Sequence, residues 1–163
     1  MHDEEDPMHE VDARPTVAPA ASDGSPDSLP IADCPFCERL ATGQETLRES
    51  LLCVSFFDTT PLNPGHVLVV PRRHVSDFFA LSRDELVAMI DMASELHREL
   101  GERFQPDGFN LGVNVGDAAG QTIGHAHLHL IPRYRGDVTD PRGGIRWIIP
   151  DRVRYWPVEA SVR

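Results

Sequence analysis

The sequence predicts an α+β domain, in which short strands form a sheet and one long helix packs on it. Several stretches of alternating or continuous apolar residues have the length and composition of strands. One stretch of about twenty residues instead repeats its apolar side chains at helical spacing. A capping-box sequence stands directly before that stretch. We expect these elements to form one domain, within residues 33–150.

Charge is unevenly distributed along the chain of 163 residues, whose formal net charge is −11. Residues 1–33 hold nine of the 26 acids and only Arg14 among the 15 basic residues, all of which are arginines. The remainder is therefore close to neutral. It contains no basic stripe of the kind that binds DNA or RNA, so we expect no nucleic-acid partner.

The two ends of the chain differ in character from its middle. Residues 1–32 are rich in Asp, Glu, Pro, Ala and Ser and lack apolar periodicity, which predicts a disordered acidic tail. They do not combine a basic region with an apolar stretch, as a signal peptide would. No apolar run approaches the 18 residues of a membrane span. We expect a cytoplasmic protein without a membrane anchor, and we assign residues 151–163 to a C-terminal extension.

A Cys-x-x-Cys motif, Cys34 to Cys37, opens the domain. Such a pair is either half of a zinc site or a redox pair. A redox pair would follow a buried strand, whereas polar sequence precedes this one, so zinc is favoured. Two further ligands would have to be histidines, since Cys53 lies in an apolar run and is expected in the core. A short helix is predicted over residues 38–44, ended by Gly43.

Residues 51–57 and 66–71 are apolar and predict an antiparallel pair of strands joined by a turn rich in Pro, Asn and Gly. Asp58 ends the first strand, either as a turn-capping side chain or as a carboxylate that accepts ribose hydroxyls. His66 begins the second strand, and His74 follows it. Taken alone, His66 would be a structural strand-end residue and His74 a surface residue.

The long helix begins after Ser82, which with Glu85 forms a capping box. Its apolar stripe is Leu86, Met89, Ile90, Ala93, Leu96, Leu100 and Phe104. Gly101 and Pro106 mark its end. His97 lies off the apolar stripe and is expected to face solvent.

A further strand is predicted over residues 109–114, followed by a polar loop over residues 116–124. In that loop, Gly120-Gln121-Thr122 either presents donors to an oxyanion or simply forms part of a hairpin. Near the C-terminus, residues 145–149 form one short apolar run.

The most distinctive stretch is residues 125–131, in which three histidines alternate with apolar residues. This alternation predicts a half-buried strand with His125, His127 and His129 on one face, ended by Pro132. Three histidines on one ridge are uncommon in a purely structural strand. The remaining explanations are a metal site or nucleophilic catalysis by an imidazole, and the triad by itself leaves both open.

These motifs together resemble those of the histidine triad (HIT) family of nucleotide hydrolases and transferases. The matching residues stand in the family's order and spacing over about residues 34–135: Phe57-Asp58, Pro64 to Pro71 including His66, Asn114, Gly120-Gln121-Thr122 and His125-x-His127-x-His129-Leu130-Ile131. The resemblance implies an antiparallel sheet of about five strands with one long packed helix. It also implies a homodimer formed through that helix and a strand.

The resemblance further implies a purine nucleotide as the small-molecule substrate, cleaved at its α-phosphate. His127 would be the nucleophile and would form a covalent nucleotidyl-histidine, while His129 and His66 would orient and polarise it. Asp58 would hold the ribose. The phosphate or the leaving group would be held by Asn114, Gln121 and Thr122.

Some bacterial members of the family bind structural zinc through a Cys pair and histidines. Carried over to this sequence, the ligands would be Cys34, Cys37, His74 and His125, with His66 as the competing choice for His74. Magnesium would enter only together with a polyphosphate substrate.

The favoured function is a hydrolase acting on nucleoside phosphoramidates, acyl-nucleotides or dinucleoside polyphosphates. A nucleotidyltransferase or phosphorylase of the same family differs only in what attacks the intermediate. The alternative from another class is a nucleotide-binding interaction module with little turnover, which the intact His127 argues against.

Overall fold

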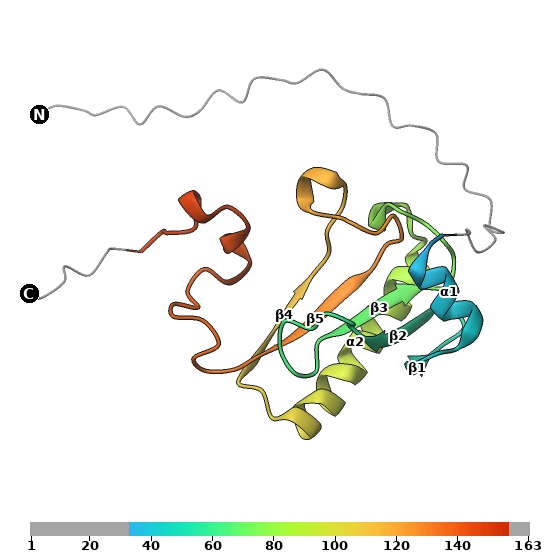
Figure 1. The fold of residues 1–163 in the computed structure, drawn as a ribbon, viewed down its shortest axis with the longest axis horizontal. Helices are drawn as coiled ribbons and strands as arrows, with labels where there is room; N and C mark the ends of the chain where they lie inside the picture. Colours follow the sequence, from blue (N-terminus) through green and yellow to red (C-terminus); the bar gives the residue numbers. More distant parts are fainter. Residues whose placement is uncertain (1–32, 157–163) are drawn as a thin grey trace, which may run out of the picture.

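The computed structural model describes residues 33–156, so the tail predicted over residues 1–32 lies outside the described residues. The described chain forms a five-stranded sheet with a long helix along one face (Figure 1). Neighbouring strands are antiparallel throughout, in the spatial order β1-β2-β3-β5-β4. The strands are β1 (Thr46–Glu49), β2 (Cys53–Phe57), β3 (Val67–Pro71), β4 (Gly108–Gly112) and β5 (Leu128–Arg133). The predicted α+β fold is therefore confirmed.

The larger core lies between the sheet and helix α2 (Arg83–Phe104). Ser82 and Glu85 form the predicted capping box, each side chain bonding to the backbone N–H of the other residue. The helix residues buried against the sheet are Met89, Met92, Ala93, Leu96 and Leu100. Ile90 was expected in this stripe but is 46% exposed, because the stripe is wider than the face that the sheet covers. Among the described residues, no helix is long and apolar enough to cross a membrane.

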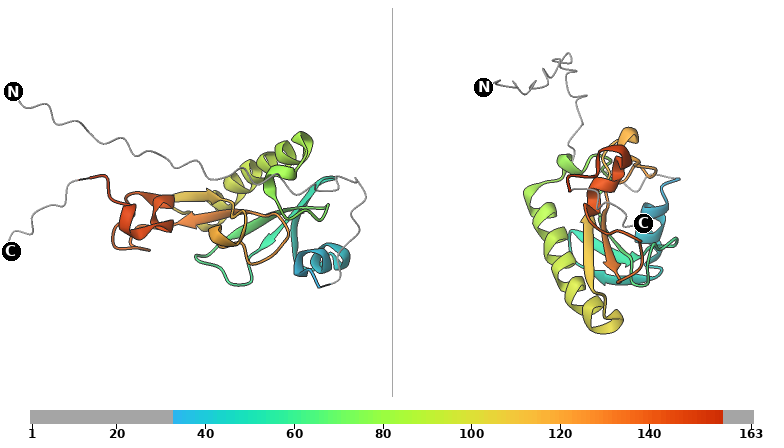
Figure 2. Two further views of the ribbon diagram at one scale, coloured as in Figure 1. Left: turned by 90° about the horizontal axis from the view of Figure 1, so that it is seen from above. Right: turned by 90° about the vertical axis from the view of Figure 1, so that its left-hand side faces the viewer.

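A smaller core lies on the opposite face of the sheet, under helix α1 (Pro35–Thr42). The right-hand view of Figure 2 shows the two helices on opposite sides of the sheet. Phe36 and Cys37 of α1 pack against β2 and β3, whose alternating side chains supply Phe56 and Val70 on this face. The helix begins three residues earlier than expected, with Pro35 at its first position, and ends at Gly43 as predicted.

Two strands differ from the expectations drawn from residue pattern. The edge strand β1 was not predicted from its own residues, because its four residues are mostly exposed and carry no alternation. The strand predicted over residues 125–131 begins only at Leu128, and it continues through Pro132, which was expected to end it, to Arg133. The three residues before it are irregular, since the Ala126 N–H donates to the carbonyl of Val75 in a loop, not to a neighbouring strand. Ala126 nevertheless lies in the α2 core, as the alternation predicted.

The chain after β5 folds back on itself in two short 3-10 helices, η3 (Gly144–Ile148) and η4 (Pro150–Arg152). Figure 2 shows this segment at one end of the sheet, beyond β4 and β5. The turn before η3 needs a glycine at position 143, where φ is +87° and a Cβ would lie 2.8 Å from the side chain of Val153. The side chain of Arg146 stabilises the turn by donating hydrogen bonds to the carbonyls of Val153 and Arg152.

Candidate active site and metal cluster

One cluster of metal-ligating side chains lies between α1 and the segment before β5. The ligand atoms of Cys34, Cys37, His74 and His125 all lie within 4.8 Å of one another. Three sulfur–nitrogen pairs are 3.3 to 3.6 Å apart: Cys34 Sγ with His125 Nδ1, Cys37 Sγ with His74 Nδ1, and Cys37 Sγ with His125 Nδ1. Tetrahedral zinc, with its usual bond lengths, separates sulfur and nitrogen ligands by about 3.6 Å. The spacing of these donors therefore fits a zinc ion.

The protonation states in this cluster also suit a metal. His125 donates from Nε2 to the carbonyl of Pro71 at 3.0 Å, so the lone pair of Nδ1 faces the two thiols. Burial lowers the pKa of His125 to about 4 and also lowers the pKa of His74. Both rings are therefore neutral at neutral pH, as metal ligands must be. His66, the competing ligand, is not part of this cluster.

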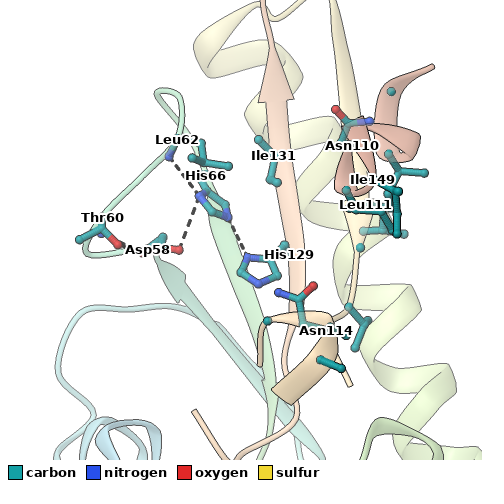
Figure 3. Close-up of a pocket in the computed structure, with 18 residues that line it drawn as sticks. Asp58, Thr60, Leu62, His66, Asn110, Leu111, Asn114, His129, Ile131 and Ile149 are labelled. Carbon is teal, nitrogen blue, oxygen red and sulfur yellow. Dashed lines mark hydrogen bonds and ion pairs between the residues drawn. The ribbon is translucent and has the colours of Figure 1, made fainter. Parts of the chain in front are cut away.

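A second cluster joins Asp58, His66 and His129 in a line (Figure 3). His66 Nε2 lies 3.0 Å from His129 Nδ1, and His66 Nδ1 lies 3.5 Å from Asp58 Oδ2. The backbone N–H of Leu62 donates to the same Nδ1 at 3.3 Å. Burial lowers the pKa of His66, and it lowers the pKa of His129 to about 4, so both rings are neutral at neutral pH.

These contacts assign the protons along the line. Nδ1 of His66 faces the Leu62 N–H, which can only donate, and the Asp58 carboxylate 3.5 Å away; when Nδ1 accepts from Leu62, the proton of that ring lies on Nε2. That Nε2–H then donates to Nδ1 of His129. His129 consequently carries its own proton on Nε2, as a free donor group at the end of the line.

His127 has the opposite arrangement. Its Nδ1 lies 2.8 Å from the carbonyl oxygen of His125, which can only accept, so Nδ1 carries the proton and Nε2 has the lone pair. The ring is 6% exposed and lies between Phe36 and His129, with ring centroids 5.1 and 4.9 Å away. A ring nitrogen with a free lone pair, Nε2 of His127, thus belongs to a ring that lies next to His129.

A cavity of about 830 Å³ opens beside His129. Figure 3 shows Asp58 and Thr60 on one side of His129, and Asn110, Leu111 and Ile149 on the other. The cavity is lined by Asp58, Thr60, Leu62, His66, Asn110, Leu111, Gly112, Val113, Asn114, Ala118, Ala119, Gly120, His129, Ile131, Gly144, Ile145, Ile148 and Ile149. Its volume is within the usual range of small-molecule sites.

Of the three predicted phosphate-binding residues, only Asn114 lines the cavity. Asn114 lines the cavity next to His129. The Gln121 side chain accepts from the Gly116 N–H and donates to the carbonyls of Ser76 and Ile123, so its polar atoms hold the loop together. Thr122 is exposed and is not among the cavity-lining residues.

Several lining residues were not identified from the sequence. Thr60 and Asn110 carry no motif of their own, and their positions follow only from the fold. Ile145, Ile148 and Ile149 come from the apolar run after β5. That run was visible in the sequence, but nothing in it indicated which surface it would cover.

Comparison with known proteins identifies the family. The family model described as HIT domain matches residues 42–136. The chain belongs to the HIT family. An adenylylsulfatase, HINT3 of Arabidopsis thaliana, is 33% identical to this HIT protein over 72% of the chain and 61% of the relative. The asymmetrical bis(5'-nucleosyl)-tetraphosphatase of Schizosaccharomyces pombe is 30% identical over 64% of the chain and 58% of the relative.

Among solved structures, this HIT protein resembles a zinc-bound histidine triad family protein from Mycobacterium smegmatis. The two share 30% sequence identity and superpose with a TM-score of 0.61, over 66% of this chain and 80% of the other. The relatives therefore include nucleotide hydrolases and a protein that binds zinc.

Proposed function

We propose that this HIT protein hydrolyses a nucleotide at its α-phosphate through a covalent nucleotidyl-histidine on His127. The observation that carries the proposal is the hydrogen bond from Nδ1 of His127 to the carbonyl of His125, which leaves the lone pair on Nε2. The named activities of the two relatives support it, because both act on nucleotides.

In the first step, Nε2 of His127 attacks the α-phosphorus and the bond to the leaving group breaks. The leaving group departs with the bonding electron pair. If it is an amine, it also takes the Nε2 proton of His129, whereas a carboxylate leaves without one. The positive charge that forms on the His127 ring is stabilised by the carbonyl of His125, which keeps its hydrogen bond to Nδ1.

In the second step, water attacks the same phosphorus and the bond to Nε2 of His127 breaks. The electron pair returns to His127. The water proton returns to His129 where that ring had protonated an amine, and otherwise passes to solvent. The products are a nucleoside monophosphate and either the free amine or the carboxylate. Inorganic phosphate in place of water would instead give a nucleoside diphosphate, which is the phosphorylase alternative.

We assign the ribose to Asp58, which lines the cavity on the side of His129 away from Asn110. Its Oδ1 already accepts from the backbone and hydroxyl of Thr60, which fixes the carboxylate in place. Asn114 is assigned to the phosphate. Gln121 and Thr122 stay in the same proposal, with Gln121 acting through the loop that its three hydrogen bonds hold.

We assign structural zinc to Cys34, Cys37, His74 and His125. A zinc ion there would join α1 to the sheet and take no part in the reaction. It would thereby hold Phe36 of α1 against the ring of His127. Because thiolate ligands need a reducing compartment to stay unoxidised, we also propose a cytoplasmic location. Magnesium is assigned only to a polyphosphate substrate, if one is used.

We further propose a homodimer formed through α2 and the edge strand β4. Val87 and Ile90 of α2 and Leu111 of β4 are 46 to 49% exposed, which leaves an uncovered apolar face. Replacing Ile90 by Asp should shift the protein from dimer to monomer in analytical ultracentrifugation, while Leu51→Asp, at an exposed leucine in the β1–β2 turn, should not. A wild-type monomer at micromolar concentration would overturn the dimer.

The decisive experiment for the function is a substrate panel with and without inorganic phosphate. It includes adenosine phosphoramidate, an acyl-adenylate and diadenosine tetraphosphate, with mass spectrometry after quenching in alkaline denaturant, because the P–N bond of the adduct on His127 is labile in acid. Turnover with an adduct of one nucleoside monophosphate on this residue supports the proposal, and dependence on phosphate identifies a phosphorylase. Nucleotide binding without turnover of any substrate would instead support a binding module.

A further inference from the structure

The proposed function does not say what the leaving group is, and the cavity has two ends of different chemistry. Asp58 and Thr60 lie at one end, with His129 between them and the other end (Figure 3). With the ribose at Asp58 and the α-phosphate beside the triad, the leaving group points toward the end near Asn110 and Ile149. The residues of that end therefore determine which leaving groups fit.

Isoleucines form the wall of this end. Ile145, Ile148 and Ile149 line the cavity and are 59%, 79% and 52% exposed in the structure. Three large apolar side chains exposed together form a patch of the kind that a binding partner covers, and their place in the cavity lining makes a bound ligand that partner. Leu111 and Ile131 extend the same apolar surface along the sheet.

The cavity also lacks cationic side chains. Within residues 33–156, its lining includes no arginine, and the chain has no lysine. Three arginines of this part of the chain have partners: Arg133 pairs with Asp137, Arg142 with Asp140, and Arg146 bonds to backbone carbonyls. A polyphosphate leaving group brings several negative charges, which proteins normally bind with arginine or lysine. An apolar leaving group needs no such partner.

One neutral donor lies within this apolar end. The side-chain oxygen of Asn110 accepts a hydrogen bond from Arg133, and Arg133 is itself fixed by both oxygens of Asp137. The Asn110 amide nitrogen is thereby turned toward Gly144, whose position for a Cβ lies 3.8 Å away. Such a donor suits an acyl carbonyl, and a single neutral donor does not neutralise the several charges of a polyphosphate.

We infer that Gly144–Ile149 forms an apolar leaving-group subsite, and that the substrate is a nucleoside monophosphate linked to an apolar amine or acyl group. This inference rests on the proposed function and narrows its substrate class. It assigns a role to a segment that none of the family's motifs includes.

The test compares three adenosine phosphoramidates whose leaving amines are of similar basicity: methylamine, hexylamine and 6-aminohexanoate. Each half-buried methylene should raise kcat/KM roughly twofold, so hexylamine should exceed methylamine by about 30-fold. The terminal carboxylate of 6-aminohexanoate should remove most of that gain. Diadenosine tetraphosphate should be turned over more slowly than the hexylamine compound.

Two variants assign the preference to the segment. Ile148→Asp should lower the ratio of hexylamine to methylamine turnover about tenfold, and Ile148→Arg should selectively raise turnover of the 6-aminohexanoate compound. Because Ile148 is mostly exposed, neither change should affect folding, which circular dichroism checks. Leu51→Asp and Leu51→Arg are the matched controls, at an exposed leucine in the β1–β2 turn.

The outcomes separate the two proposals. A wild-type protein that turns over neither the three phosphoramidates nor an acyl-adenylate nor diadenosine tetraphosphate would overturn the proposed function and this inference with it. Turnover without a chain-length preference, or a preference for diadenosine tetraphosphate, would leave the function standing and overturn the subsite. A preference that survives unchanged in both Ile148 variants would show that another surface binds the leaving group.

Discussion

The two histidine clusters use the same residue type, and burial shifts the pKa of their histidines in the same direction, yet their contacts differ. Burial lowers the pKa of His125 and of His129 to about 4, so both rings are neutral. The lone pair of His125 faces two thiols, whereas that of His129 accepts a hydrogen bond from His66. Burial alone therefore does not decide what a histidine does. The partner of each ring nitrogen decides whether the other nitrogen binds a metal or offers a proton.

The strongest test of this comparison is His127→Ala. Removing the nucleophile should lower kcat/KM by 10⁴-fold or more, because no other group in the proposed mechanism forms the intermediate. Metal content should not change, and AMP affinity by calorimetry should stay within a few-fold. His97→Ala, at an exposed histidine of α2, is the control. Residual activity near wild type in His127→Ala would overturn the mechanism.

Cys37→Ser tests the other cluster. It removes the thiol that lies against both His74 and His125 in the proposed zinc site. Bound zinc should therefore fall from one equivalent to near zero by elemental analysis. Because metal binding contributes directly to folding, the thermal midpoint should fall by roughly 10 °C or more. Cys53→Ala, in the core beside Met92, should keep its metal. Full zinc content in Cys37→Ser would mean that the cluster is not the metal site.

His66→Gln and His74→Gln form a matched pair across the two clusters. Loss of His66 removes the hydrogen bond between His66 and His129. It should lower kcat by about 10²-fold and leave the metal content unchanged. Loss of His74 should lower metal content, and activity only as a consequence. If both variants lost metal, or if neither did, the assignment of metal binding to one cluster and of catalysis to the other would be wrong.

The smallest expected effect is on stability in acid. His129 binds a proton near pH 6.5 when unfolded, but only near pH 4 when folded. The unfolded state therefore binds more protons between these values, and stability should fall as the pH drops from about 6.5 to about 4. Urea denaturation of the metal-free protein should show a shallower fall for His129→Gln. Parallel curves for variant and wild type would contradict this.

Local patterns in the sequence predicted much of the fold. The capping box of Ser82 and Glu85 and the apolar repeat after it set α2, because both signals lie within a few turns of chain. The pairing of β2 with β3 followed from two apolar runs joined by a short turn. The positions of Asp58 and His66 came with these elements, since each stands at the end of a strand.

Other features depend on distant partners and were not predictable from pattern. The irregular backbone before Leu128 is set by the carbonyl of Val75 and by the thiols of α1. One of the three hydrogen bonds of the Gln121 side chain is made to the carbonyl of Ser76, 45 residues away. The apolar run at residues 145–149 has no strong period. Its position against the cavity results from the turn at Gly143.

That turn determines how the cavity wall responds to a ligand. With glycine required at position 143 and Val153 packed beneath it, the wall is already in place before a substrate arrives. Binding of a ligand against this wall therefore does not include the conformational-entropy cost of ordering a loose segment. A side chain at position 143 would leave every residue that lines the cavity chemically unchanged. It would nevertheless weaken ligand binding, because the Gly144–Ile149 wall could then move.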